Sequence, residues 1–195
     1  MNKINTRYIT QIAAMSAVAG VLMMFEVPLW FAPGFYKMDL SDLPALIGGF
    51  AMGPLAGMLI ELFKVIISIV LGGTSTFFVG ETSNFIIGCS FVVPASIVYK
   101  HMRSRKGAYT GMLIGTVVLA SVGSAMNAFV LIPAYVKILG FPMEQIVAMG
   151  TAVNPAITSL STLVLFAVVP FNLLKGVLVS LITALIYKKI RILIK

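Results

Sequence analysis

Charged residues are scarce in this chain. Of its 195 residues, only 10% are Asp, Glu, Lys or Arg, whereas 59% are hydrophobic, and the mean hydropathy is +1.05. A water-soluble domain needs far more charge to cover its surface, so a soluble protein is excluded. We therefore expect an integral, multi-pass membrane protein surrounded by lipid. No polar stretch is long enough to form a second domain, which predicts a single domain over residues 1–195.

Cysteine and histidine each occur once, as Cys89 and His101. A single cysteine excludes a disulfide within the chain, and one cysteine with one histidine cannot build a metal cluster. The phosphate-loop pattern G-x-x-x-x-G-K-[ST], the nucleophile motif G-x-S-x-G and the zinc motif H-E-x-x-H are absent as well. We therefore expect no enzyme, no bound cofactor or metal, and no ATP hydrolysis through a phosphate loop in this chain.

Long apolar runs, separated by Pro- and Gly-rich or basic segments, predict an all-α membrane protein with six transmembrane helices. The expected spans are residues 8–27, 42–52, 54–71, 81–99, 108–135 and 170–187. Residues 137–155 are expected to form a polar connection. Residues 156–169 are apolar but interrupted by Ser and Thr, and they belong either to a helical hairpin or to the upper part of a kinked last span.

The basic residues gather around residues 3–7, 100–106 and 188–195, at the ends of the apolar runs. Positive charge at span ends marks the cytoplasmic side, so both termini are expected in the cytoplasm. The segments 28–40, 72–80 and 137–155 then lie outside. The formal net charge of +8 therefore reports membrane topology, and we expect no nucleic acid as a partner.

A lysine lies where a lipid-facing helix should have none. Lys175 and Asn172 are three residues apart and share one helix face, and an ammonium facing hydrocarbon costs roughly 3 kcal/mol or more. In the expected topology both lie in the outer half of the membrane, as do Asn127 of the fifth span and Glu81 and Asn84 of the fourth. This convergence predicts a polar ligand pocket open to the outside.

Structural roles stay open for individual residues. Lys175 can pair with Glu81 or with a backbone carbonyl without touching a ligand. Glu61 and Lys64 are also three residues apart, and we interpret them as a structural pair that lies deeper and nearer the cytoplasm. Asp42 is interpreted as a helix cap. The convergence of several polar side chains, rather than any one of them, favours the pocket.

The first external loop, residues 28–40, contains four aromatic side chains and a charge pair. Those aromatic residues form either a lid over the pocket or an aromatic belt at the membrane surface. Asparagine both donates and accepts hydrogen bonds, and lysine offers up to three donors. A pocket with these groups suits a neutral, amphipathic small molecule that combines a flat apolar ring with a polyol or amide-rich part.

The first span has a smooth surface of small side chains. Ala13 and Ala17 form one small-x-x-x-small pair, and Ser16 and Gly20 form another. Such faces let helices approach closely. Packing within the chain explains them, and so does docking of a separate subunit.

Two segments carry a family resemblance. Residues 35–44 (Phe-Tyr-Lys-Met-Asp-Leu-Ser-Asp-Leu-Pro), followed by Gly-Pro at 53–54, resemble the substrate-binding subunits (S-components) of energy-coupling factor (ECF) vitamin transporters. The Glu-Thr-Ser-Asn stretch at 81–84, the late Asn127 and residues 170–176 (Pro-Phe-Asn-Leu-Leu-Lys-Gly) look like the riboflavin-specific branch. The resemblance covers essentially the whole chain.

The resemblance implies a six-helix subunit of the bacterial plasma membrane that binds its vitamin near the outer face, under a lid formed by the first loop. The implied partners are a transmembrane coupling subunit, on which the loaded subunit topples, and two cytoplasmic ATPases. Ala13 and Ala17 would face the coupling subunit. The implied substrate-binding residues are Met38, Asp39, Leu40, Glu81, Asn84, Asn127, Asn172 and Lys175. Among them, the two later asparagines and the lysine would hold the ribityl hydroxyls of riboflavin, and Leu40 with its neighbours would pack on the isoalloxazine ring.

Two other functions remain open from the sequence. The first is binding of another vitamin, such as thiamine or biotin, by the same kind of subunit. The second is a stand-alone secondary transporter driven by protons or sodium, in which Glu61 or Glu81 would titrate.

Overall fold

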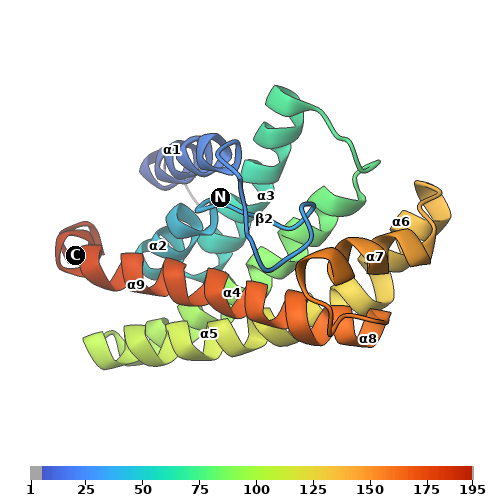
Figure 1. The fold of residues 1–195 in the computed structure, drawn as a ribbon. Helices are drawn as coiled ribbons and strands as arrows, with labels where there is room; N and C mark the ends of the chain where they lie inside the picture. The colour runs from blue at the N-terminus through green and yellow to red at the C-terminus, as the bar shows by residue number, and fades with distance from the viewer. Residues whose placement is uncertain (1–5, 195) are drawn as a thin grey trace.

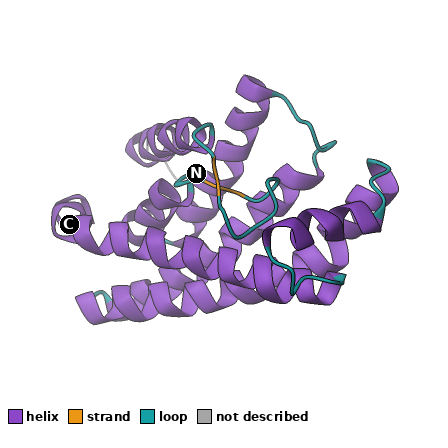
Figure 2. Cartoon of the chain, viewed as in Figure 1, coloured by secondary structure: helices purple, strands orange, loops and turns teal. Residues whose placement is uncertain are grey.

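The computed structural model describes residues 6–194, and their side chains through residue 186. Over this part of the chain the fold is helical, with one short two-stranded ribbon (Figures 1 and 2). The elements are α1 (Thr6–Met23), β1 (Val27–Pro28), β2 (Lys37–Met38), α2 (Asp42–Met52), α3 (Pro54–Gly72), α4 (Val79–Met102), α5 (Arg105–Met126), η1 (Asn127–Leu131), α6 (Ile132–Ile138), α7 (Met143–Val153), α8 (Leu160–Leu163), η2 (Val164–Val168) and α9 (Val169–Ile194). The expected all-α fold is thus confirmed for the described residues.

Helix α2 is short and forms the centre of the larger core. Its side chains Leu46 and Phe50 are buried, and the helix contacts α1, α3, α4 and α9. Gly53 separates α2 from α3 with a backbone φ of 100°, a conformation that favours glycine. Pro54 then occupies the first turn of α3, where its missing N–H is not needed. The predicted break at these two residues is confirmed.

Two long helical segments run side by side across the molecule (Figure 1). One runs from Arg105 to Ile138 through α5, η1 and α6, and the other begins at Leu160 and continues through η2 into α9. Each contains a π-helical turn followed two residues later by a proline, Pro133 or Pro170. Proline removes one helical hydrogen bond, and a local π turn lets the helix continue past it.

Two sequence predictions about this region were wrong in part. Residues 137–155 are not simply a polar connection, because residues 143–153 form helix α7. The last helix does not begin at Pro170 but at Leu160, because the π-helical turn accommodates the proline. The interpretation of residues 156–169 as the upper part of a kinked last span is therefore correct for the residues from 160 onward.

Four helical segments of the described chain are long and apolar enough to cross a membrane: Pro54–Gly72, Val79–Met102, Arg105–Ile138 and Leu160–Ile186. Helix α1 has 18 residues and corresponds to the predicted first span. Helix α2, with 11 residues, is about 16 Å long, which is about half the thickness of a hydrocarbon core of about 30 Å. Lys3, one of the residues used to predict topology, lies outside the described residues.

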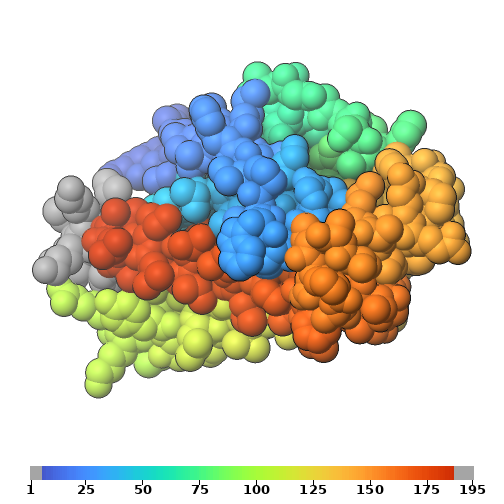
Figure 3. Space-filling view, in the orientation of Figure 1, coloured from blue at the N-terminus to red at the C-terminus, as the bar shows by residue number. Residues whose placement is uncertain are grey.

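The segment between α1 and α2 folds back over the helices. Strands β1 and β2 pair antiparallel, with Val27 opposite Met38. Next to this pair, the ammonium of Lys37 contacts the carboxylate of Glu26 at 3.0 Å. In the space-filling view this segment (blue) covers the middle of the visible face, next to α9 (red) (Figure 3). We call residues 27–40 the lid.

Candidate ligand cavity

Two adjoining cavities lie beneath the lid. The outer cavity has a volume of about 550 Å³ and lies between the lid, the end of α3, the start of α4 and the end of α5–α6. The inner cavity has a volume of about 110 Å³ and reaches α9. Both are lined by Tyr36, Lys37, Asp39, Gly80, Asn84 and Leu131. The shared lining makes them two parts of one site, which we call the lid site.

Asn127 lies at the inner cavity, and both polar atoms of its side-chain amide make hydrogen bonds. Its Nδ2 donates to the carbonyl oxygen of Gly123 at 2.8 Å, and its Oδ1 accepts a hydrogen bond from the Tyr36 hydroxyl at 2.7 Å. Tyr36 packs against Phe171 at a ring distance of 5.6 Å. Burial raises the pKa of the Tyr36 hydroxyl well above its ordinary value, and the neighbouring Tyr135 adds to the shift. The hydroxyl therefore remains a donor to Asn127.

Asn172 and Lys175 also line the inner cavity and are almost fully buried, with 3% and 7% of their surface exposed. The Nδ2 of Asn172 donates to the carbonyl of Val168 at 2.9 Å. The ammonium of Lys175 lies 3.0 Å from Asp42 Oδ2 and 3.4 Å from Asp39 Oδ2. The sequence allowed a pair between Lys175 and Glu81; the lysine pairs instead with two aspartates from the lid and the start of α2.

The ion pairs continue below Lys175 into α3. Lys64 makes a close ion pair with Asp42 and another with Glu61, the latter at 2.6 Å. The predicted pairing of Glu61 with Lys64 is confirmed, and Asp42 connects this pair to Lys175 of the lid site. The interpretation of Asp42 as a helix cap is wrong: Ser41 occupies the cap position before α2, without a side-chain cap bond. Asp42 is 1% exposed and lies between two ammonium groups. Buried charges are retained when they are paired in this way.

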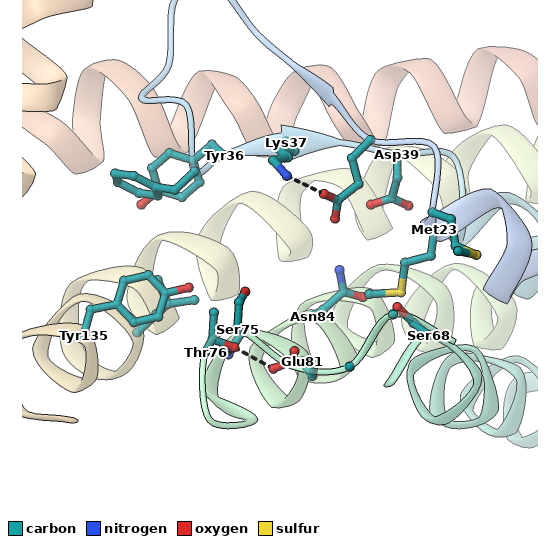
Figure 4. A pocket seen from close by; sticks show the side chains of 17 residues that line it. Met23, Tyr36, Lys37, Asp39, Ser68, Ser75, Thr76, Glu81, Asn84 and Tyr135 are labelled. Carbon is teal, nitrogen blue, oxygen red and sulfur yellow. Dashed lines mark hydrogen bonds and ion pairs between the residues drawn. The ribbon is translucent and has the colours of Figure 1, made fainter. Parts of the chain in front are cut away.

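The outer cavity contains the other two predicted residues of α4. Glu81 accepts a hydrogen bond from Thr76 Oγ1 at 2.6 Å. Asn84 faces Asp39 and Met23 across the cavity (Figure 4). The buried Oδ1 of Asn84 has no hydrogen-bond partner among the residues that the structure describes. A buried unpaired acceptor favours a ligand that brings a donor.

Six of the eight predicted site residues therefore line the lid site: Asp39, Glu81, Asn84, Asn127, Asn172 and Lys175. Met38 is buried in the apolar cluster around the lid, whereas Leu40 packs against the larger core. Their contact with a ligand stays a prediction. Sequence reasoning missed Tyr36 as a hydrogen-bond partner, although the hydroxyl of an aromatic residue in the lid was a signal that could have suggested it.

The small residues of α1 divide between two faces. Ser16 and Gly20 are buried, and Gly20 lies so close to Ile67 of α3 that a Cβ would meet its side chain. Ala13 and Ala17 are exposed. Ala13 borders a groove of about 460 Å³ between α1 and α3, lined by Tyr8, Ile9, Ile12, Ala13, Ser16, Leu59, Phe63 and Ile67. One small pair thus packs within the chain, and the other lies on the surface.

The helical fold, the four membrane-length helical segments and the polar cavity under a lid define a membrane protein built to hold a small ligand. Residues 7–187 match the family described as "ECF transporter, substrate-specific component". The chain belongs to this family. It is therefore a multi-pass membrane component of a transporter, not an enzyme, and as a substrate-specific component it has the rest of an ECF transporter as its partner.

Several relatives carry names that include a substrate. The chain is 34% identical to the "Riboflavin transporter RibU" of Staphylococcus aureus (strain TCH60), covering 95% of this chain and 90% of that relative. It is 32% identical to the "Riboflavin transporter FmnP" of Bacillus subtilis (strain 168), covering 92% and 90%. A solved structure, described as the S component of a bacterial ECF transporter, has a TM-score of 0.76 and 30% identity, covering 98% of this chain and 99% of that one.

Proposed function

We propose that this chain binds riboflavin at the lid site and mediates its uptake together with an ECF module. The observation that carries the proposal is the convergence of Asn84, Asn127, Asn172 and Lys175 on a cavity roofed by an aromatic lid. The names of the relatives at about 30% identity point to the same substrate.

The outer and inner cavities of the lid site differ in size and in lining, and these differences match the flat ring and the polyol chain of riboflavin. The outer cavity, about 550 Å³, lies within the size range of roughly 300–1,000 Å³ that is usual for small-molecule pockets. Phe35, Tyr36 and Tyr135 give it aromatic surface for a flat ring. The inner cavity is much smaller, about 110 Å³, and ends at Asn172 and Lys175. We assign the isoalloxazine ring to the outer part and the ribityl chain to the inner part.

The pairing of the lysines with carboxylates also favours a neutral ligand. Lys175 and Lys64 are engaged with Asp39, Asp42 and Glu61, so neither lysine carries an uncompensated positive charge that would attract an anion. Lys37 in the outer cavity is paired with Glu26. A ribityl hydroxyl can accept from Lys175 and donate to an asparagine without changing the charge of the site.

Fluorescence titration of the purified chain tests the substrate. Riboflavin is fluorescent, and stacking on the aromatic lid is expected to quench its emission. Thiamine and biotin, added in excess before riboflavin, are the matched competitors. Quenching that saturates at one flavin per chain and survives both competitors supports the proposal. A lack of quenching, or its loss with either competitor, refutes riboflavin as the substrate.

For transport, we propose six membrane-embedded helices with both termini in the cytoplasm and the lid outside. The turn between α4 and α5 and the C-terminal end of α9 lie at one end of the molecule, and α6–α8 lie at the other (Figure 1). The partners would be a transmembrane coupling subunit and two ATPases. The exposed Ala13 and Ala17, beside the apolar groove of α1 and α3, would contact the coupling subunit as the loaded chain topples.

Uptake into liposomes separates this proposal from a stand-alone transporter. Riboflavin accumulation that requires the complete ECF module and ATP supports a binding subunit. Accumulation by the chain alone, driven by a proton or sodium gradient, would refute it.

A further inference from the structure

Gly123 lies between the two asparagines of the inner cavity without lining the cavity itself. It is buried in the last turn of α5 and faces α9. Its carbonyl oxygen accepts the hydrogen bond from Asn127 Nδ2 at 2.8 Å. Its Cα lies against the side-chain amide of Asn172 on the neighbouring helix. One residue thus contacts both amides, from two different helical segments.

The space beside Gly123 leaves no room for a larger side chain while Asn172 keeps its position. A Cβ at Gly123 would lie 2.8 Å from both Cγ and Nδ2 of Asn172 and 2.9 Å from its Oδ1. These contacts are shorter than carbon atoms tolerate. The atoms that would be displaced are the end of one side chain, not backbone. An added methyl group would therefore move the Asn172 amide and leave the α5–α9 backbone packing in place.

We infer that Gly123 is a positioning residue for ligand binding: its missing side chain sets the place of the Asn172 amide, and its carbonyl fixes the Asn127 amide. The inference rests on the proposed function, because it gives a role in ligand recognition to a residue that touches no ligand. Asn172 is 3% exposed and holds the Val168 carbonyl at 2.9 Å. A displaced amide would lose this bond as well as its direction toward the cavity.

The first test is Gly123→Ala, measured by flavin titration and by thermal unfolding in detergent. Alanine favours a helix more than glycine does, and this gain offsets the loss of the bond between Asn172 and the Val168 carbonyl, so the melting temperature should change little. Riboflavin affinity should fall about tenfold, the typical effect of one lost neutral hydrogen bond. Gly176→Ala is the matched control. Its Cβ would also meet a side chain at 2.8 Å across the α5–α9 contact, but that side chain is Thr116, which does not line the lid site.

A double-mutant cycle decides whether Gly123 acts through Asn172. In the background of Asn172→Ala, where the amide is already missing, adding Gly123→Ala should weaken binding by less than twofold. A tenfold loss from Gly123→Ala in both the wild-type and the Asn172→Ala background would overturn the inference. A loss of affinity in Gly176→Ala as large as that in Gly123→Ala would also overturn it. If the wild-type chain binds no flavin, the proposed function is refuted, and this inference is refuted with it. If the wild-type chain binds flavin but the losses in the cycle are additive, the inference is overturned and the proposed function stands.

Discussion

Replacing Lys175 with methionine is the most direct perturbation of the lid site. The lysine lines the inner cavity and lies 3.0 Å from Asp42 and 3.4 Å from Asp39. At an effective dielectric constant of about 20, the pair at 3.0 Å has a Coulomb energy of about 5–6 kcal/mol. Desolvation of both groups offsets part of this energy, and loss of one partner from a buried pair typically lowers stability by about 3–5 kcal/mol.

The substitution also changes the charge of the cluster. Three carboxylates, on Asp39, Asp42 and Glu61, face two lysines, so the formal charge is −1 and becomes −2 when Lys175 is lost. We expect Lys175→Met to lower the free energy of unfolding by about 3 kcal/mol or more. Separately, riboflavin binding should weaken by about 1–3 kcal/mol because a charged donor to the ligand is missing.

A compensating variant separates these two effects. Adding Asp39→Asn to Lys175→Met restores the formal charge of −1, and Asp42 keeps Lys64 as its partner. The double variant should recover much of the stability, measured by thermal unfolding without ligand. It should still bind riboflavin weakly in the fluorescence titration, because the ammonium donor is absent. Wild-type affinity in either variant, or wild-type stability of the single variant, would refute the role that we give to Lys175.

Three further predictions concern other parts of the molecule. Asn172→Leu should weaken riboflavin binding by about 1–3 kcal/mol; unchanged affinity in titration would remove this residue from the site. Tyr36→Phe should weaken binding by about 1 kcal/mol through the lost hydrogen bond to Asn127. Because burial raises the Tyr36 pKa, binding by the wild-type chain should show no loss from tyrosinate formation up to about pH 10. A loss of binding on raising the pH toward about 10 that disappears in Tyr36→Phe would contradict this. Ala13→Trp should preserve flavin binding and abolish uptake by the reconstituted ECF complex, whereas surviving uptake would exclude this face of α1 as the docking surface.

The sequence alone determined the class of this protein and much of its local structure. Scarcity of charge and long apolar runs excluded a soluble fold, because lipid and water demand different surfaces. The breaks at Gly53–Pro54 and Gly72–Gly73 followed from local backbone preferences, and α2 and α3 end where those residues predicted. The polar residues of the predicted outer layer were visible because a buried amide or ammonium is costly in a membrane and therefore rare.

Only the tertiary structure decided which of these polar residues meet. Lys175 pairs with Asp39, 136 positions earlier, and Tyr36 bonds to Asn127, 91 positions later. Such partners depend on how helices pack and how the lid folds back, which no local preference encodes. The π-helical turns, the helix at 143–153 and the close approach of Gly123 to Asn172 have the same origin. Hydropathy places a side chain at a depth in the membrane, but packing between helices sets its neighbours and its direction.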